Sequence, residues 1–200
     1  MKIPKIALFI LFTSLAVYAQ ENALDSKHTG GGKKPDDNCG ILYGRNHALT
    51  FCAPDGWLLD NGIMNDQGIY AVFYPKGSNW GEAKKSKTFM YINVVDMSAK
   101  DTVATRMDSD VKEEKQYNPK TEASRADPIR VGDLSVPVLK FDLGESDGRE
   151  AVAYIGESKV LVMMVISSKN EAMFKHDYPF FEQLVKSYKF LTSDVHIQNK

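Results

Sequence analysis

The stretch Leu49-Thr50-Phe51-Cys52-Ala53-Pro54-Asp55-Gly56-Trp57 combines strand-forming residues with a turn sequence. Residues 48–53 are predicted to form a strand. Pro54-Asp55-Gly56 then favours a turn, because proline presets its own φ and glycine tolerates positive φ. A second strand is expected at 57–59. The folded part of the chain is therefore predicted to open with two strands joined by a short turn.

Two later segments predict the centre of a sheet. Residues 88–96 are apolar on both faces, and 160–166 are apolar throughout. A strand that is apolar on both faces is buried on both, so these strands are expected inside a sheet covered by helices.

Further strands are predicted on either side of these two. The expected ranges are 68–74, 128–131, 134–143 and 149–155, and the central strand at 160–166 is expected to extend over 159–168. Aspartate–glycine and glycine-rich turns separate the later strands. Pro137 cannot donate a hydrogen bond to a sheet, so it predicts an edge position or a bulge.

A first helix is expected over residues 100–117, where Val103, Met107 and Val111 recur every four residues. Ser98 is its expected N-cap. The charged run 108–115 favours a solvated helix face over a metal site, since a metal site would need ligands from a second converging element.

A second helix is expected near the C-terminus. An apolar seam runs from Phe174 to Tyr188 at helical spacing. Pro179 interrupts the seam and predicts either a kink or a fresh start capped by Asp177. Residues 192–200 are predicted to be a polar tail.

Two motifs resemble those of PsbP-like domains. Phe51, Pro54, Gly56 and Trp57 match the family's opening pattern of phenylalanine, two residues, proline, any residue, glycine and tryptophan, and 184–190 is similar to its closing helix. The resemblance covers Leu49 to Leu191. It implies an α+β fold, an α/β/α sandwich with a mainly antiparallel central sheet. It also implies a binding, chaperoning or assembly role rather than catalysis, and no functional residue of the family maps onto a matching motif.

The N-terminus predicts export. Lys2 and Lys5 precede an apolar run, and a small residue stands before the expected cleavage between Ala19 and Gln20. An uncleaved anchor is the alternative, but a spanning helix needs about 20 apolar residues and this run is shorter. The predicted organisation is a signal peptide at 1–19, a flexible tether at 20–38 and a single domain at 39–191. The expected location is secreted or periplasmic.

The net charge argues against nucleic-acid binding, and the cysteine content predicts a disulfide. The net charge of −1 lacks the basic excess of nucleic-acid-binding proteins. The chain contains two cysteines, Cys39 and Cys52, and an exported protein with two cysteines is expected to pair them in a disulfide.

No catalytic, metal or cofactor site is predicted. Of the four histidines, His28 and His196 lie in predicted mobile segments, and His47 and His176 lack an accompanying nucleophile motif. The acidic loop 60–67 lacks the spacing of a calcium-binding loop, and turn formation explains its composition.

Aromatic residues near strand ends are the candidates for partner contact. Trp80 is the preferred contact residue, and Tyr74 is a second. We therefore expect an exported, non-catalytic binding or assembly module that recognises a protein or envelope partner. The alternatives are a small secreted hydrolase with a site assembled from loops, and a divalent-metal-binding protein.

Overall fold

The computed structural model describes residues 38–61, 69, 71–78, 87–144 and 148–195. Its elements, in chain order, are β1 (Cys39–Gly44), β2 (His47–Cys52), β3 (Trp57–Asp60), β4 (Ala71–Pro75), β5 (Thr88–Asp96), α1 (Val103–Tyr117), β6 (Glu122–Val131), β7 (Leu134–Asp142), β8 (Arg149–Gly156), β9 (Val160–Ser168), α2 (Glu171–Lys186) and β10 (Lys189–Thr192).

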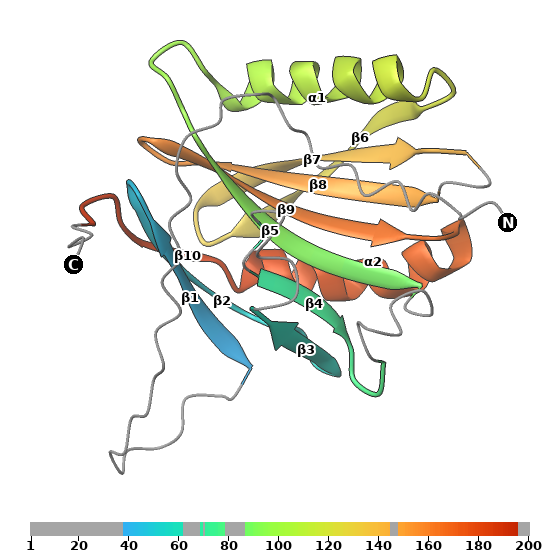
Figure 1. The fold of residues 1–200 in the computed structure, drawn as a ribbon, viewed down its shortest axis with the longest axis horizontal. Helices are drawn as coiled ribbons and strands as arrows, with labels where there is room; N and C mark the ends of the chain where they lie inside the picture. Colours follow the sequence, from blue (N-terminus) through green and yellow to red (C-terminus); the bar gives the residue numbers. More distant parts are fainter. Residues whose placement is uncertain (1–37, 62–68, 70, 79–86, 145–147, 196–200) are drawn as a thin grey trace, which may run out of the picture.

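A seven-stranded sheet forms the middle layer of the molecule, in the order β3-β4-β5-β9-β8-β7-β6. All its neighbouring strands are antiparallel. Figure 1 shows α1 over one face of this sheet, with α2 and the small sheet β1-β2-β10 on the other side. The predicted α+β class and α/β/α sandwich are confirmed.

The two strands predicted to be central lie next to each other inside the sheet. β5 pairs with β9 along its whole length, from Thr88 opposite Ser168 to Asp96 opposite Val160. Residues 160–166 of β9 are all buried. Burial on both faces therefore explains why these segments carry apolar residues without alternation.

The larger core lies between the sheet and α2. Phe174, Phe181, Leu184 and Val185 of α2 are buried there. Leu49 and Phe51 of the small sheet close the same core. The buried residues of α2 follow the predicted apolar seam along the length of the helix.

The predicted fresh start at Pro179 is wrong, because α2 is continuous through this residue. Its N-cap is Asn170, whose side chain accepts a 3.0 Å hydrogen bond from the Met173 amide. An internal proline costs a helix about 3 kcal/mol, whereas each large apolar side chain that becomes buried contributes about 1.5–3 kcal/mol. Burial of the seam on both sides of Pro179 outweighs that cost.

Two smaller predictions also need correction. The N-cap of α1 is Thr102 rather than Ser98, and it forms a capping box with Thr105. Pro137 is not on an edge strand, because β7 lies between β6 and β8. The bulge alternative holds, since the register of β6 against β7 shifts between Ala126 and Ile129, opposite Pro137.

β1 and β10 were not predicted, and they flank β2 in the small sheet. Cys39 and Cys52 are direct cross-strand partners of β1 and β2, and they form the expected disulfide. The bridge therefore fixes β1 to β2. Within the part of the chain that the structure describes, neither helix has the length and apolar character needed to cross a membrane.

Candidate functional site

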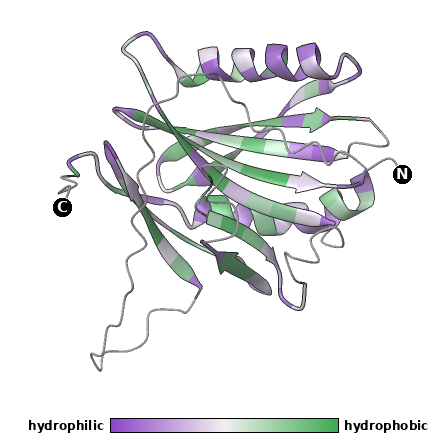
Figure 2. Ribbon diagram, viewed as in Figure 1, coloured by the Kyte–Doolittle hydropathy of each residue, from purple (hydrophilic) through white to green (hydrophobic). Residues whose placement is uncertain are grey.

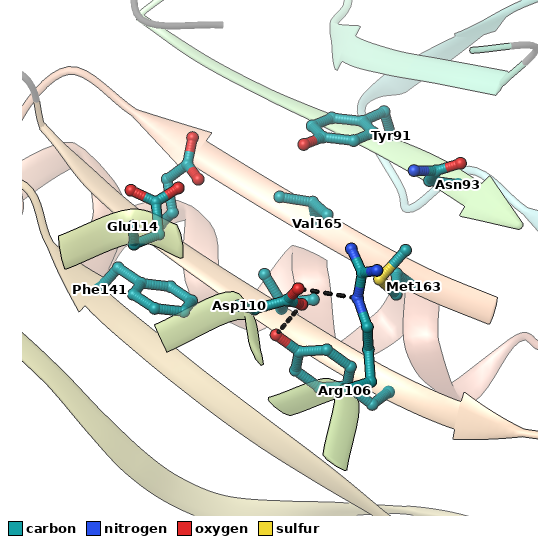
Figure 3. Close-up of a pocket in the computed structure, with 11 residues that line it drawn as sticks. Tyr91, Asn93, Arg106, Asp110, Glu114, Phe141, Met163 and Val165 are labelled. Carbon is teal, nitrogen blue, oxygen red and sulfur yellow. Dashed lines mark hydrogen bonds and ion pairs between the residues drawn. The ribbon is translucent and has the colours of Figure 1, made fainter. Parts of the chain in front are cut away.

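A cavity of about 40 Å³ lies between α1 and the seven-stranded sheet. Helix α1 contributes residues to its lining on one side, and strands β5, β7, β8 and β9 contribute the rest. Figure 3 shows the lining side chains, which are Tyr91, Asn93, Arg106, Asp110, Glu114, Phe141, Glu150, Val152, Tyr154, Met163 and Val165. Ionisable groups are therefore enclosed together with apolar walls.

The helical contribution to this cavity is a line of charged residues. Arg106, Asp110 and Glu114 are spaced by four, which places them on one helix face. Asp110 and Glu114 are buried, as is Met107 beside them. Figure 2 shows α1 mainly in hydrophilic and intermediate colours, unlike the strands it covers. The helix thus directs carboxylates, as well as apolar side chains, towards the sheet.

This arrangement corrects the expectation for the charged run 108–115. Asp110 and Glu114 are only 4% and 5% exposed, so they do not belong to a solvated face. The prediction holds for Asp108, Lys112 and Lys115, which are exposed on the outer side.

Asp110 makes one ion pair and one hydrogen bond in the cavity. The Arg106 Nε lies 2.7 Å from its Oδ1, and the Tyr154 hydroxyl donates a 2.8 Å hydrogen bond to its Oδ2. Burial raises the pKa of Asp110 to about 6, although Arg106 and Tyr154 both oppose the shift. Desolvation therefore outweighs the positive neighbour and the hydrogen bond.

The other two carboxyl groups have pKa values close to neutrality. Burial raises the pKa of Glu114 to about 7, and the negative charges of Asp110 and Glu113 add to the effect. Burial also raises the pKa of Glu150 to about 7, against a hydrogen bond from Ser167 and with added repulsion from Glu114. At neutral pH these groups are therefore divided between protonated and ionised forms.

Two tyrosines complete the polar part of the cavity. Burial raises the pKa of Tyr91 well above its usual value, and the surrounding carboxylates raise it further. The pKa of Tyr154 is raised for the same reasons, with Asp110 as the main charged neighbour. Both tyrosines therefore remain neutral hydroxyls that can donate hydrogen bonds to carboxylates.

The size of the cavity limits its chemistry. Sites for organic ligands usually enclose about 300–1,000 Å³, whereas this cavity has room for a few water-sized groups. Among the described residues that line it, none is a serine, cysteine or histidine. Across the described part of the chain, His, Cys, Asp and Glu side chains do not gather in threes around a metal position.

Tyr74, one of the two predicted contact residues, does not line this cavity. Tyr74 is half-buried at the end of β4, and its hydroxyl donates a 3.2 Å hydrogen bond to Asp60 Oδ2. Trp80 and the expected cleavage site at Ala19 and Gln20 lie outside the described residues, as does most of the acidic loop 60–67.

The two histidines within the described ranges lie outside the cavity too. His47 Nδ1 lies 3.0 Å from the Arg45 carbonyl oxygen at the turn after β1. His176 is exposed on α2, as expected of a surface histidine. Its Nδ1 lies 2.7 Å from Asp177 Oδ1, although adjacent residues on a helix do not ordinarily face each other.

A second feature is an apolar outer face on the small sheet. Ile41 and Tyr43 of β1 are 63% and 54% exposed, and Leu191 of β10 is 46% exposed. Their neighbours Leu42 and Phe190 pack into the core instead. Because side chains alternate along a strand, all three exposed residues point away from the core. We call Ile41, Tyr43 and Leu191 the outer apolar face.

Sequence reasoning missed both features. The sequence pattern that indicates the cavity is the recurrence of Arg106, Asp110 and Glu114 every four residues. This charged row lies next to the apolar row of the helix, because Arg106 precedes Met107 and Asp110 precedes Val111. The signal for β1 was the uncharged stretch CGILYG at 39–44, which contains Ile41 and Tyr43 at alternate positions.

No protein-family model and no curated protein matches the chain. Among solved structures, the chain is similar to cyanobacterial PsbP (CyanoP) from Synechocystis sp. PCC 6803, with a TM-score of 0.51 and 12% identity, over 82% of this chain and 98% of that one. A crystal structure from Bacteroides thetaiotaomicron VPI-5482 superposes with a TM-score of 0.44 and 12% identity, over 79% of this chain and 50% of that one. The first similarity is one of fold.

Proposed function

Because the chain has a PsbP-like fold, we propose that it is an exported, non-catalytic binding or assembly module that recognises a protein partner in the cell envelope. The observation that carries this proposal is the outer apolar face. Five large apolar residues are exposed among the described residues, and three of them lie on this one small sheet. Grouped apolar side chains on a surface are typical of protein interaction sites.

The composition of the outer apolar face suits a protein contact. Ile41 and Tyr43 lie beside Thr50 and Ala48 of β2, and Leu191 lies on the far side of the same strand. Strands in a sheet are about 4.8 Å apart, so the three side chains fall within about 10 Å of one another across it. Tyrosine is enriched among residues that dominate binding energy. A partner with a complementary apolar patch would bury Tyr43 together with Ile41 and Leu191.

Export is the second part of the proposal. The disulfide between Cys39 and Cys52 is consistent with an oxidising compartment. The proposed precursor carries a signal peptide at 1–19, and the tether at 20–38 leads into β1. Sequencing of the N-terminus of protein isolated from the host envelope tests this part. A start at Gln20 supports it, and an intact Met1 contradicts it.

The hydrolase alternative has one feature in its favour, the buried carboxyl groups. Carboxyls with a pKa near 7 are suited to proton transfer. A hydrolase must also enclose its substrate beside them, and a cavity of about 40 Å³ accommodates water-sized groups rather than an organic substrate. The binding role is therefore the better-supported proposal.

Matched surface variants test the binding role. The protein is purified from its own host with bound partners, as wild type and as Tyr43→Ser and Leu191→Ser. The controls are Tyr117→Ser and Leu134→Ser, because Tyr117 and Leu134 are 60% and 47% exposed and lie outside the outer apolar face. We expect a stoichiometric partner with wild type and both controls, and its loss with both test variants. A partner retained equally by all four variants contradicts the proposed face.

A further inference from the structure

The cavity under α1 is lined by a buried glutamate, Glu114, whose carboxyl group has no partner among the described residues. Glu114 is 5% exposed and lines the cavity. Its carboxylate makes no hydrogen bond or ion pair with any residue in the described ranges, and its charged neighbours Asp110 and Glu113 are both negative. A buried charge is costly unless a group of opposite charge or a hydrogen-bond donor accompanies it.

Charge in the cavity is unbalanced. Arg106 is the cationic residue that lines it, and its Nε is engaged with Asp110. Glu150, on β8, is 7% exposed and feels the negative charge of Glu114 directly. Its hydrogen bond comes from the neutral hydroxyl of Ser167. Two carboxylates from opposite walls therefore have no cation between them within the described part of the chain.

The space available defines which cation would fit. A water-sized group needs about 10–15 Å³ of such a cavity, so about 40 Å³ accommodates a compact group and one or two waters. A metal ion would need several converging ligands, and the described acidic side chains do not converge in threes. An ammonium group is compact and offers three rotatable donors.

The walls also suit an ammonium group attached to carbon. Phe141, Val152, Met163 and Val165 line the cavity beside the carboxylates. Figure 3 shows Arg106 reaching towards Asp110, with its polar head beside Met163. The Arg106 side chain is 20% exposed, so this end of the cavity extends to the surface.

We propose that the cavity between α1 and the sheet binds a primary ammonium group, held between the carboxylates of Glu114 and Glu150. The hydroxyl of Tyr91 supplies a further hydrogen-bonding group at the site. The ammonium can come from a free small amine or from a lysine side chain of another protein. This proposal concerns a different surface from the outer apolar face and does not depend on it.

The test titrates methylammonium chloride into the protein purified from its host, at pH 8, and follows binding by calorimetry and by the thermal unfolding midpoint. Tetramethylammonium chloride at the same concentration controls for charge and ionic strength, because it has no N–H donor and is bulkier. We expect methylammonium alone to bind and to raise the unfolding midpoint. Equal effects of the two cations overturn the proposal.

Variants locate the site. Glu114→Gln and Glu150→Gln are each expected to weaken methylammonium binding about tenfold or more, because each removes a charge-assisted hydrogen bond. Glu122→Gln, at an exposed position of β6, is the matched control and keeps wild-type affinity. Two test variants are used so that poor folding of one leaves a result from the other. Retention of full affinity by both overturns the proposal, as does preferential binding of Ca²⁺ or Mg²⁺ to the same residues.

Two peptides distinguish the sources of the ammonium. Acetyl-Gly-Lys-Gly-amide presents a lysine side chain, and acetyl-Gly-Arg-Gly-amide is its control with the wider guanidinium. Binding of the lysine peptide with the same Glu114 dependence assigns the site to a protein lysine. Binding of methylammonium without the peptide assigns it to a small free amine. Failure of both to bind overturns the proposal and leaves the outer apolar face untouched.

Discussion

The hydroxyl of Tyr154 donates a 2.8 Å hydrogen bond to Asp110 Oδ2, which joins the middle of β8 to α1 inside the core. The two residues are 1% and 4% exposed. Met107 is the buried apolar residue of α1, and Val103 and Val111 are partly buried against the same core. Attachment of α1 therefore combines apolar packing with a polar contact made away from water.

Tyr154→Phe tests the polar contact. The substitution keeps the ring and removes the donor, so Oδ2 of Asp110 remains buried without its hydrogen bond. We expect a loss of about 1–3 kcal/mol in the free energy of unfolding, measured by chemical denaturation. Tyr43→Phe is the control, because Tyr43 is 54% exposed and its change should be within about 0.5 kcal/mol. Equal effects of the two substitutions would contradict the role of this contact.

Stability is expected to fall as pH rises through neutrality. The pKa values of Glu114 and Glu150 are about 7 in the folded protein and 4.5 in a solvated chain. The folded state thus holds these protons more tightly, and their contribution is complete below pH 4.5 and lost as pH passes 7. We expect the free energy of unfolding to be lower at pH 8 than at pH 5 by at least about 2 kcal/mol, measured by urea denaturation.

Glu114→Gln separates this effect from other titrations. The groups around Glu114 are Arg106, Asp110 and Glu113 on α1, and Tyr91, Glu150 and Tyr154 on the sheet. Removing one ionisable carboxyl should flatten the decline in stability between pH 5 and 8, whereas Glu122→Gln should leave it unchanged. A wild-type profile that rises over this interval would show that the carboxyls are not held protonated.

The centre of the fold could be predicted from sequence, and the small sheet could not. β5 and β9 were recognisable because apolar residues occupy both faces of each strand, which indicates burial on both sides. β10 pairs with β2, from which it is separated by most of the domain, as in the register of Lys189 with Thr50. A strand of four residues is too short to show a clear alternation of apolar and polar residues, so the sequence does not indicate that β10 pairs with β2.

The cavity was hidden for a related reason. Asp110 and Glu114 on a charged helix are ordinarily solvated, and their burial depends on residues far along the chain. Tyr154 lies 44 residues after Asp110, and Glu150 lies on the same later strand. The sequence of the helix alone does not indicate which of its faces will contact Tyr154 and Glu150.

Two glycines with the same backbone conformation predict different tolerance to alanine. Gly144 and Gly148 have φ of 95° and 96°, a region that favours glycine. A Cβ at Gly144 would meet nothing within 4 Å, whereas one at Gly148 would collide with the carbonyl oxygen of Ser168. Gly144→Ala should cost about 1–2 kcal/mol from backbone strain, and Gly148→Ala should cost about 2 kcal/mol more. Similar unfolding midpoints for the two variants would contradict this difference.

The disulfide should stabilise the domain by closing the segment between β1 and β2. For a separation of 13 residues, chain entropy gives about 3 kcal/mol. The double variant Cys39→Ser with Cys52→Ser should lose about this amount in guanidinium denaturation, and added reductant should then have no further effect. Intact mass before and after reduction and alkylation checks the bond itself. Two free thiols in protein from its native compartment would contradict it.

Photo-cross-linking in the host tests the binding role most directly. A benzophenone amino acid replaces Tyr43 on the outer apolar face or Tyr117 at the end of α1, two tyrosines of similar exposure. We expect one discrete cross-linked species from position 43 and none from position 117. Equal cross-linking from both positions, or none from position 43, would contradict a partner bound at the outer apolar face.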